Sequence, residues 1–336
     1  MQNSDLQAKW LKIQAKYPEA NFLQSPSWGK VNELIGYKVV TLEDTASWCL
    51  MIVKNAKRGR YLEVPGGPLV DWADAGAVSN IFAQIKAVAE REKCVFIRMR
   101  PQLRMSEENL QLLEAQGCQK APMHLHAEHT VMINLEKSEE ELLADMRRQT
   151  RYEVRKADKL GIEVEWGDSE ELFREFHQVQ LETAARQHFV PPDLKMLLAE
   201  RKGFLGDSAE NPGIRIYTAK TADGQVICYG LIIIDGVEAE YFEAASTELG
   251  RQFPGTYALL WRAMRDLKAM GLKRFNLWGI APEGQPNHRY AGVTTFKKGF
   301  GGEVVEFVPA EDIILKKSRY LVNLAVETAR KKKRHL

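Results

Sequence analysis

The chain has 336 residues, of which 45% are hydrophobic and 27% are charged, and its formal net charge is +2. This balance excludes a disordered, fibrous or strongly polycationic protein, and the length favours two domains of modest size. No apolar stretch approaches the roughly 18 residues that a transmembrane helix needs, and the polar N-terminus contains no hydrophobic signal region, so we expect a cytoplasmic protein. The cysteines are scattered without a Cys-x-x-Cys pair, and no metal site is predicted.

The first part of the chain predicts two helices followed by a strand, loop, helix, strand unit. Apolar residues at helical spacing from Leu6 to Tyr17 indicate the first helix, and Ser25-Pro26, a cap residue before a proline, begins the second. The remaining expected elements are strands at 48–53 and 60–64, a Pro/Gly loop at 65–68, a helix with an apolar face over 78–89 and a strand at 94–99.

The middle of the chain carries the densest run of positive charge. Ser138-Glu139-Glu140-Glu141 is a capping box that begins a helix, and this helix continues or restarts through 147–159, where six of thirteen residues are Lys or Arg. Further elements are expected as a strand at 162–166, a helix from Asp168 and strands at 214–219 and 225–234, the last of which should be buried on both faces.

The order of the first strand, loop, helix, strand unit returns later in the chain. The second set comprises a strand at 238–244, a Gly/Pro loop at 250–255, a helix at 257–270 and a strand at 274–280. The offset from Tyr61 to Cys94 equals that from Tyr241 to Arg274, 33 residues in each case, so we expect a duplicated α/β domain. A last strand at 303–307 and a helix from about Ala310, which ends in a basic tail at 331–334, complete the expected elements.

An ordered set of short motifs spans nearly the whole chain. The motifs are Phe22-Leu23-Gln24-Ser25 with Trp28-Gly29, Leu62-Glu63-Val64-Pro65-Gly66-Gly67-Pro68, Met146-Arg147-Arg148 with Tyr152-x-x-Arg155-Lys156-Ala157, Glu182-Thr183-Ala184-Ala185-Arg186 with Phe189, Tyr241-Phe242-Glu243-Ala244-Ala245-Ser246, Trp278-Gly279-Ile280 and Phe296-Lys297-Lys298-Gly299-Phe300-Gly301-Gly302. Together they resemble the Fem family of peptidyltransferases, whose members use aminoacyl-tRNA to build the side-chain bridge of peptidoglycan.

The resemblance implies a fold of two tandem domains that are similar to GCN5-related acetyltransferases (GNAT). It places residues 1–136 with the returning segment 305–336 in domain 1, which would bind the precursor, and residues 137–304 in domain 2, which would carry out aminoacyl transfer. No long coiled-coil insertion is visible, so the chain looks like the compact FemX-like members. The expected class is therefore α/β with two GNAT-like domains and no helical arm.

The implied reaction transfers an amino acid from aminoacyl-tRNA to the stem peptide of UDP-MurNAc-pentapeptide or lipid II, and it needs no cofactor. Because the ester is already activated, catalysis requires positioning and a positive charge near the developing oxyanion. Lys297 matches the family position thought to supply that charge, although spacing does not tell it from Lys298. The resemblance also implies a substrate-binding set, in which the precursor's phosphates and carboxylates would be held by cations and an aromatic wall. This set comprises Lys30, Trp28, Arg186, Tyr241 and Phe296.

A tRNA partner requires a cationic surface that reads phosphates without reading sequence. The expected surface comprises Arg147, Arg148, Arg151, Arg155 and Lys156. The tail at 331–334 could instead contact anionic lipid at the inner face of the membrane if the acceptor is lipid II. We expect a monomer.

Two rival interpretations remain open. The first is an acetyl-CoA-dependent N-acetyltransferase, although Pro254 lacks the amide hydrogen that a pyrophosphate-binding loop would donate and Thr256 adds bulk there. The second is a non-catalytic module that binds RNA or membrane. The chain also departs from the family at Arg100, where many relatives place an acidic residue before the proline. That departure argues against a proton acceptor at this position.

Overall fold

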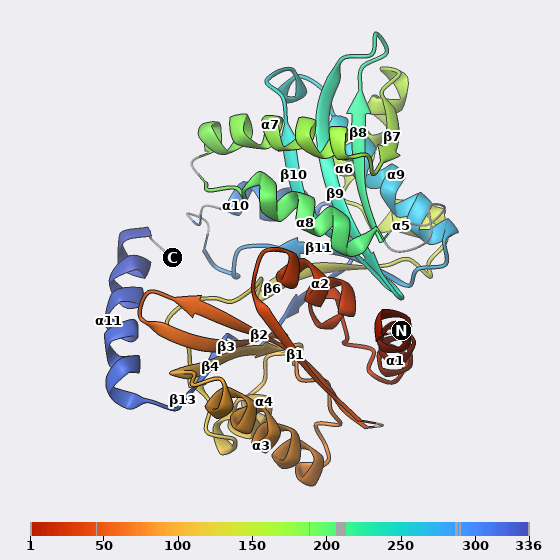
Figure 1. Ribbon diagram of the computed structural model, residues 1–336. Coiled ribbons are helices and arrows are strands. Elements are labelled where there is room, and N and C mark those ends of the chain that lie inside the picture. The colour runs from red at the N-terminus through yellow and green to blue at the C-terminus, as the bar shows by residue number, and fades with distance from the viewer. Residues whose placement is uncertain are drawn as a thin grey trace. The chain divides into compact units, whose positions relative to one another are not determined.

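The computed structural model describes residues 2–44, 46–187, 189–205, 213–285, 288 and 290–334, without the side chains of residues 2–4 and 332–334. The chain forms two compact units, and each contains one mixed β-sheet with helices packed on it (Figure 1). Unit 1 comprises Met1–Glu128 and Glu306–Leu336, and unit 2 comprises His129–Val305. The α/β class expected from the sequence is confirmed.

Unit 1 is built on a sheet with the strand order β1-β2-β3-β4-β13-β5. Its elements are α1 (Gln2–Lys16), the 3-10 helix η1 (Phe22–Gln24), α2 (Pro26–Leu34), β1 (Lys38–Glu43), β2 (Trp48–Ala56), β3 (Gly59–Gly66), α3 (Ala75–Arg91), β4 (Phe96–Pro101), α4 (Glu107–Ala115), β5 (Gln119–Lys120), β13 (Glu311–Ile314) and α11 (Lys317–Arg334). The cap at the start of α2 is the expected one: Ser25 Oγ accepts the backbone N–H of Trp28 at 3.1 Å, and Pro26 occupies the first turn.

The faces of the unit 1 sheet are covered by different helices because strand residues alternate between faces. Ile97 packs with α3 in the main core, whereas its neighbour Phe96 packs against Tyr320 of α11 on the other face. The C-terminal segment is therefore part of this unit. Figure 1 shows α11 running along the edge of the unit, close to β13 and β4.

Unit 2 is built on a sheet with the strand order β12-β6-β11-β10-β9-β8-β7. Its elements are β6 (His129–Asn134), α5 (Glu139–Asp145), α6 (Arg148–Lys159), β7 (Glu163–Gly167), α7 (Glu170–Gln187), α8 (Leu194–Phe204), β8 (Ile214–Lys220), β9 (Val226–Asp235), β10 (Glu238–Ser246), the 3-10 helix η2 (Leu249–Arg251), α9 (Gly255–Ala269), β11 (Arg274–Gly279), α10 (Ala291–Lys298) and β12 (Glu303–Glu306).

Two helix pairs cover the unit 2 sheet. The apolar side chains of α9 and Val154 of α6 belong to one core cluster with the central strands. Helices α7 and α8 pack on each other, and Phe176 of α7 meets Tyr229 of β9 edge-on, with ring centroids 6.1 Å apart. The sheet is thus buried on both faces, as the apolar run of β9 indicates.

The repeated unit expected from the sequence is present in both sheets. In unit 1, β3 continues through α3 to β4, and β3 pairs with β4 in parallel. In unit 2, β10 continues through α9 to β11, and these two strands are again parallel. Each parallel pair has an antiparallel strand on its far side, β13 in unit 1 and β6 in unit 2. The same arrangement of strands therefore occurs twice.

The structure corrects two expectations near the unit boundaries. The units divide at 128/129 rather than 136/137, because β6 pairs with β11 and so belongs to the unit 2 sheet. The helix expected from about Ala310 is wrong at its start, because residues 311–314 form strand β13 and α11 begins only at Lys317. The reason is tertiary: Asp312 is fully buried and accepts a two-pronged hydrogen bond from Arg98 of β4, at 2.8 Å for each contact.

Candidate active site

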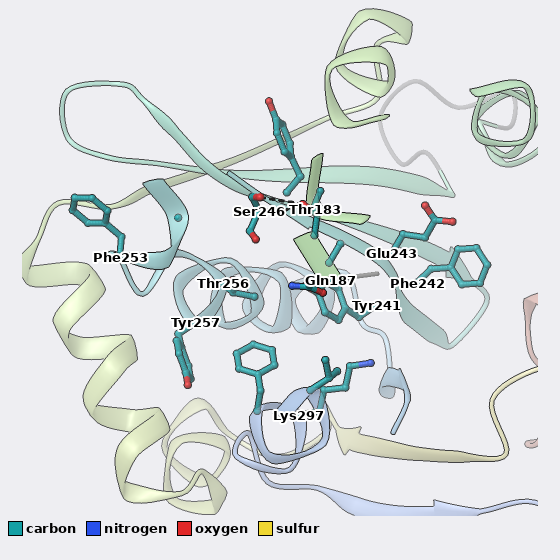
Figure 2. Close-up of a pocket in the computed structure, with 16 residues that line it drawn as sticks. Thr183, Gln187, Tyr241, Phe242, Glu243, Ser246, Phe253, Thr256, Tyr257 and Lys297 are labelled. Atoms are coloured by element: carbon teal, nitrogen blue, oxygen red, sulfur yellow. Dashed lines mark hydrogen bonds between the residues drawn. The ribbon is translucent and has the colours of Figure 1, made fainter. Parts of the chain in front are cut away.

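A cavity of unit 2 lies where the two parallel strands β10 and β11 separate. Residue pairing between β10 and β11 stops at Glu240 and Asn276, although β10 continues to Ser246. The pairing of β10 with β9 is irregular between Tyr241 and Glu243, which re-aims the side chains that follow. A cavity of about 400 Å³ opens there. It is lined by Thr183, Gln187, Tyr229, residues 241–246, Gly250, Phe253, Thr256, Tyr257, Val293, Phe296 and Lys297 (Figure 2).

A bend at the end of β11 contacts one residue of the cavity wall. Trp278 has φ of +61°, a left-handed conformation that side chains other than glycine adopt only when neighbouring groups hold them. Here the backbone N–H of Trp278 donates to Asn276 Oδ1 at 2.9 Å, and the Thr130 hydroxyl donates to the Trp278 carbonyl at 3.2 Å. The bend leaves the carbonyl of Gly279 directed at a side chain of α10.

That side chain is Lys297. Its Nζ donates to the Gly279 carbonyl at 2.9 Å and lies 5.9 Å from the centroid of the Tyr241 ring. Lys297 is only 8% exposed, and burial lowers its pKa from 10.5 to about 7. The next residue, Lys298, is exposed. The structure therefore distinguishes the two lysines, and Figure 2 shows Lys297 on the element that faces Tyr241.

Aromatic residues hold Phe296 in the wall of the cavity. Its ring packs edge-on against Tyr257 of α9, with centroids 5.1 Å apart, and against Phe300 at 5.3 Å. Tyr257 also lies 5.8 Å from Phe300, so the three rings form one cluster. Phe296, which the sequence motif singled out, is thus brought together with Lys297 and Tyr241. Tyr257 was missed because it was assigned only to the start of an expected helix.

Arg186 lies beside the cavity and secures the end of β10. Its guanidinium donates to the Ser246 carbonyl and, at 3.3 Å, to Thr183 Oγ. The Ser246 backbone N–H donates to the same Thr183 hydroxyl at 3.1 Å. The Arg186 side chain remains 28% exposed, and Glu248 lies 3.8 Å away. Arg186 therefore combines a structural contact with a partly accessible charge next to two residues that line the cavity.

Two carboxyl groups, one partly buried and one fully buried, interact at the cavity. Glu243, which lines it, accepts a hydrogen bond from Gln180 Nε2 at 2.6 Å. Burial raises the pKa of Glu243 to about 7, against the opposing effect of Gln180. Glu200 of α8 is 1% exposed, and its pKa is also raised, first by burial and then by the charge of Glu243. Two such groups resist simultaneous ionisation, so the pair retains a proton near neutral pH. Sequence analysis missed both, although Glu243 follows Tyr241 closely in one motif.

Trp28 and Lys30 belong to α2 of unit 1 and are not among the residues that line the cavity. Trp28 is 6% exposed and meets the Phe22 ring edge-on, with centroids 5.4 Å apart. Lys30 is exposed. The structure thus places a buried aromatic residue and an accessible cation within one turn of this helix. Arg100, the residue that departs from the family pattern, is buried in the same unit and donates to Gln102 Oε1 at 2.7 Å.

The cationic segment does not form one continuous helix. Helix α5 ends at Asp145, Met146 and Arg147 are extended, and α6 restarts at Arg148. Arg151 folds back and donates to the α5 carbonyls of Leu143, at 3.3 Å, and Ala144, at 3.0 Å, and also to that of Met146. Arg151 therefore satisfies the end of α5. Arg147, Arg148 and Arg155 are exposed, and Lys156 is partly buried.

The loop before α9 is shaped by packing against β9. A Cβ atom added at Gly250 would lie 2.1 Å from the Ile227 carbonyl oxygen, and one at Gly255 would lie 2.5 Å from the Ile227 side chain. Close packing within the unit is thus sufficient to explain both glycines. Pro254 precedes the helix and no side chain caps its first turn. Within the described part of the chain, no cluster of metal-ligating residues is present and no helix is long and apolar enough to cross a membrane.

Comparisons with known proteins relate both units to one group. The model of the FemAB family matches residues 10–195 and 214–327. The aminoacyltransferase FemA of Staphylococcus epidermidis is 23% identical over 86% of this chain and 88% of its own length. FemA of Staphylococcus aureus is 30% identical over a shorter segment, 24% of this chain and 20% of its own length.

Solved structures show the same fold at low sequence identity. The crystal structure of FemX covers 96% of this chain and 98% of its own, with a TM-score of 0.84 at 17% identity. The structure of L-PGS from Bacillus licheniformis covers 97% of this chain and 96% of its own, with a TM-score of 0.60 at 13% identity. The likeness thus extends over both units.

Proposed function

The chain belongs to the FemAB family, and from the cavity around Lys297 we propose that it is an aminoacyltransferase that moves an amino acid from aminoacyl-tRNA to an amine of a peptidoglycan stem peptide. The observation that carries the proposal is a buried lysine at the point where two parallel strands separate. The relatives named as aminoacyltransferases support the class of reaction. The tRNA donor and the peptidoglycan acceptor follow from the family resemblance.

The transfer can be written with the residues of the cavity. The acceptor nitrogen attacks the ester carbonyl carbon, and the carbonyl oxygen becomes an oxyanion. The Lys297 ammonium has three N–H donors, and the Gly279 carbonyl accepts one of them, so others can stabilise that oxygen. Collapse re-forms the carbonyl and breaks the bond to the ribose oxygen, which takes up the proton that the nitrogen loses. No covalent intermediate with the protein is required.

The remaining expected site residues have roles consistent with their positions. Tyr241 and Phe296 line the cavity and would enclose the aminoacyl group. Arg186 is partly exposed beside it, and Lys30 is an exposed cation, so both could contact phosphate or carboxylate groups of the precursor. We propose Trp28 as a residue that supports Lys30, because its own ring is buried.

The experiment uses the purified full-length protein with a pool of charged, radiolabelled tRNAs. UDP-MurNAc-pentapeptide and lipid II are offered as separate acceptors, and labelled acetyl-CoA replaces the charged tRNAs in a parallel reaction. Label in a precursor from tRNA would support the proposal, identify the amino acid and distinguish the soluble acceptor from the lipid-linked one. Activity with lipid II alone would further place the enzyme at the inner face of the membrane.

Two results would reject the proposal. Label that moves only from acetyl-CoA would identify an acetyltransferase, and absence of transfer from either donor to either acceptor would favour a non-catalytic binding module. Lys297→Met serves as the variant that should lose transfer, and Lys298→Met is the matched control, because this neighbouring lysine is exposed.

A further inference from the structure

One face of α6 carries an exposed aromatic ring among cations. Tyr152 is 57% exposed, the largest exposure of an aromatic side chain among the described residues. An α-helix turns about 100° per residue, so a view along the helix axis places four cations within about 60° of Tyr152. They are Arg148, Arg155, Lys156 and Lys159. The acidic residues of this helix, Glu153 and Asp158, lie about 100° and 120° away from Tyr152 and so outside this face.

The cations around Tyr152 differ from several other surface cations of unit 2, which form ion pairs. Several exposed Lys and Arg side chains elsewhere in the unit are paired with carboxylates. Examples are Arg174 with Glu170 at 2.6 Å, Arg262 with Asp266 at 2.8 Å and Lys137 with Asp145 at 2.6 Å. Among the described residues, no carboxylate lies within ion-pair distance of the cations around Tyr152. Like charges one turn apart, such as Arg155 and Lys159, disfavour the helix by themselves. The face is therefore suited to an anionic partner.

Helix α6 begins beside the end of α10, the helix that carries Lys297. The backbone N–H of Arg147, its N-terminal cap, donates to the carbonyl of Gly299 at 2.9 Å, and Gly299 ends the helix that carries Lys297. Tyr257, which lines the cavity, has a pKa raised by burial, and the charges of Glu153 and Arg147 also act on its hydroxyl. Tyr152 lies four residues along α6 from Arg148, about 6 Å of helix rise.

We propose that the face of α6 around Tyr152 binds the single-stranded 3′ end of the donor RNA, with the Tyr152 ring stacked on a base and the surrounding cations in contact with phosphates. This inference rests on the proposed function, because it assumes that the reacting ester of an aminoacyl-tRNA enters the cavity. The nucleotides next to the terminal ribose must then leave over the surface beside it. Base stacking on an aromatic side chain suits an unpaired end of constant sequence.

A membrane surface fits this face less well. A helix that lies on a bilayer buries a broad apolar stripe, and here the cations surround a single aromatic residue. Arg151 also takes no part in the proposed contact, because its guanidinium already binds the carbonyls at the end of α5. The proposed RNA-binding surface is thus one face of α6, with the Tyr152 ring at its centre.

The test measures binding directly, by fluorescence anisotropy of 5′-labelled RNA hairpins with the full-length protein. One hairpin ends in unpaired CCA and its partner ends blunt. We expect Tyr152→Ala to weaken binding of the first hairpin by roughly 5- to 100-fold and to leave the blunt one nearly unchanged. Tyr152→Phe keeps the ring and should bind like the wild type. Arg155→Ala should weaken both and reduce the slope of log affinity against log salt by about 0.7.

The controls separate this proposal from the proposed function. Arg174→Ala removes an exposed cation that is already ion-paired and should not alter RNA binding. Unchanged affinity of Tyr152→Ala for the CCA hairpin, together with normal transfer from charged tRNA in that variant, would overturn the inference alone. Loss of transfer from charged tRNA in the wild type would instead reject the function. Binding of anionic vesicles through Tyr152, without RNA binding, would assign the face to a membrane and also overturn the inference.

Discussion

Replacing Lys297 with methionine distinguishes a catalytic role of this cation from a structural one. Methionine keeps an unbranched side chain in the cavity but removes the charge beside the Gly279 carbonyl. If the ammonium stabilises the oxyanion, its loss should reduce the transfer rate by roughly 100-fold or more, the effect of losing one such donor. The same change should alter stability in the opposite direction, because a buried cation opposes folding.

The stability effect follows from the shift in pKa. Burial lowers the pKa of Lys297 from 10.5 to about 7, and 3.5 pH units correspond to about 5 kcal/mol against the charged folded state. Between these values the unfolded chain binds the proton and the folded protein does not, so wild-type stability rises with pH across this window by about 1.4 kcal/mol per unit. Below pH 7 both the folded and the unfolded state bind the proton, and the full cost of burying the charge, about 5 kcal/mol, lowers the stability. Loss of the hydrogen bond to Gly279 offsets about 1–3 kcal/mol of the gain on substitution.

Lys297→Met should therefore be more stable than the wild type by about 2–4 kcal/mol at pH 6, and little different from it near pH 9. Urea denaturation at both pH values and single-turnover transfer from charged tRNA measure the two effects. Lys298→Met is the control and should change neither, because this side chain is exposed. Wild-type turnover in Lys297→Met, or a variant that is less stable than the wild type at pH 6, would refute the reasoning.

Three further substitutions test contacts elsewhere in the molecule. Arg98→Met leaves the fully buried Asp312 without its cation and should reduce the free energy of unfolding by about 3–5 kcal/mol in urea titrations. Arg151→Met should cost about 1–3 kcal/mol in the same assay, because the carbonyls that end α5 lose their donor. Glu243→Gln should stabilise the protein by about 2–3 kcal/mol at pH 8 and have no effect near pH 4, since the raised pKa of Glu243 makes wild-type stability fall as pH rises from 4.5 to 7. Equal melting temperatures of Glu243→Gln and wild type at pH 8 would contradict that assignment.

The repeated supersecondary unit could be predicted because its signals are local. Each helix of the repeat has apolar residues at helical spacing, and Gly/Pro loops precede it, so strand, loop, helix and strand can be identified from spacing and turn chemistry. The caps at Ser25 and Ser138 were predictable for the same reason, and both are present. In contrast, the strand at residues 311–314 depends on pairing with β4 and on the ion pair of the buried Asp312 with Arg98, which is far away in the chain.

The cavity also contains some residues that the motifs identified and others that only packing brings together. The motifs identified Tyr241, Phe296 and Lys297 as candidates, and the structure brings them together around one cavity. The motifs did not identify Glu243 and Glu200 as an interacting pair, because the two residues lie on separate elements, β10 and α8, and only packing makes them neighbours. Nor could they show that Arg151 caps α5, since that role depends on the break between α5 and α6.

The amino-acid pattern alone determined the two-domain α/β class, the duplicated unit and the motifs that indicate the family, because helical spacing, strand runs and capping residues act over a few neighbouring positions. Tertiary structure decided which of two adjacent lysines is buried. Successive helix residues point about 100° apart, so only the packing of α10 against the bend at Gly279 turns Lys297 inward and leaves Lys298 in solvent. The pKa of Lys297 follows from that burial, since desolvation depends on every element that surrounds the charge.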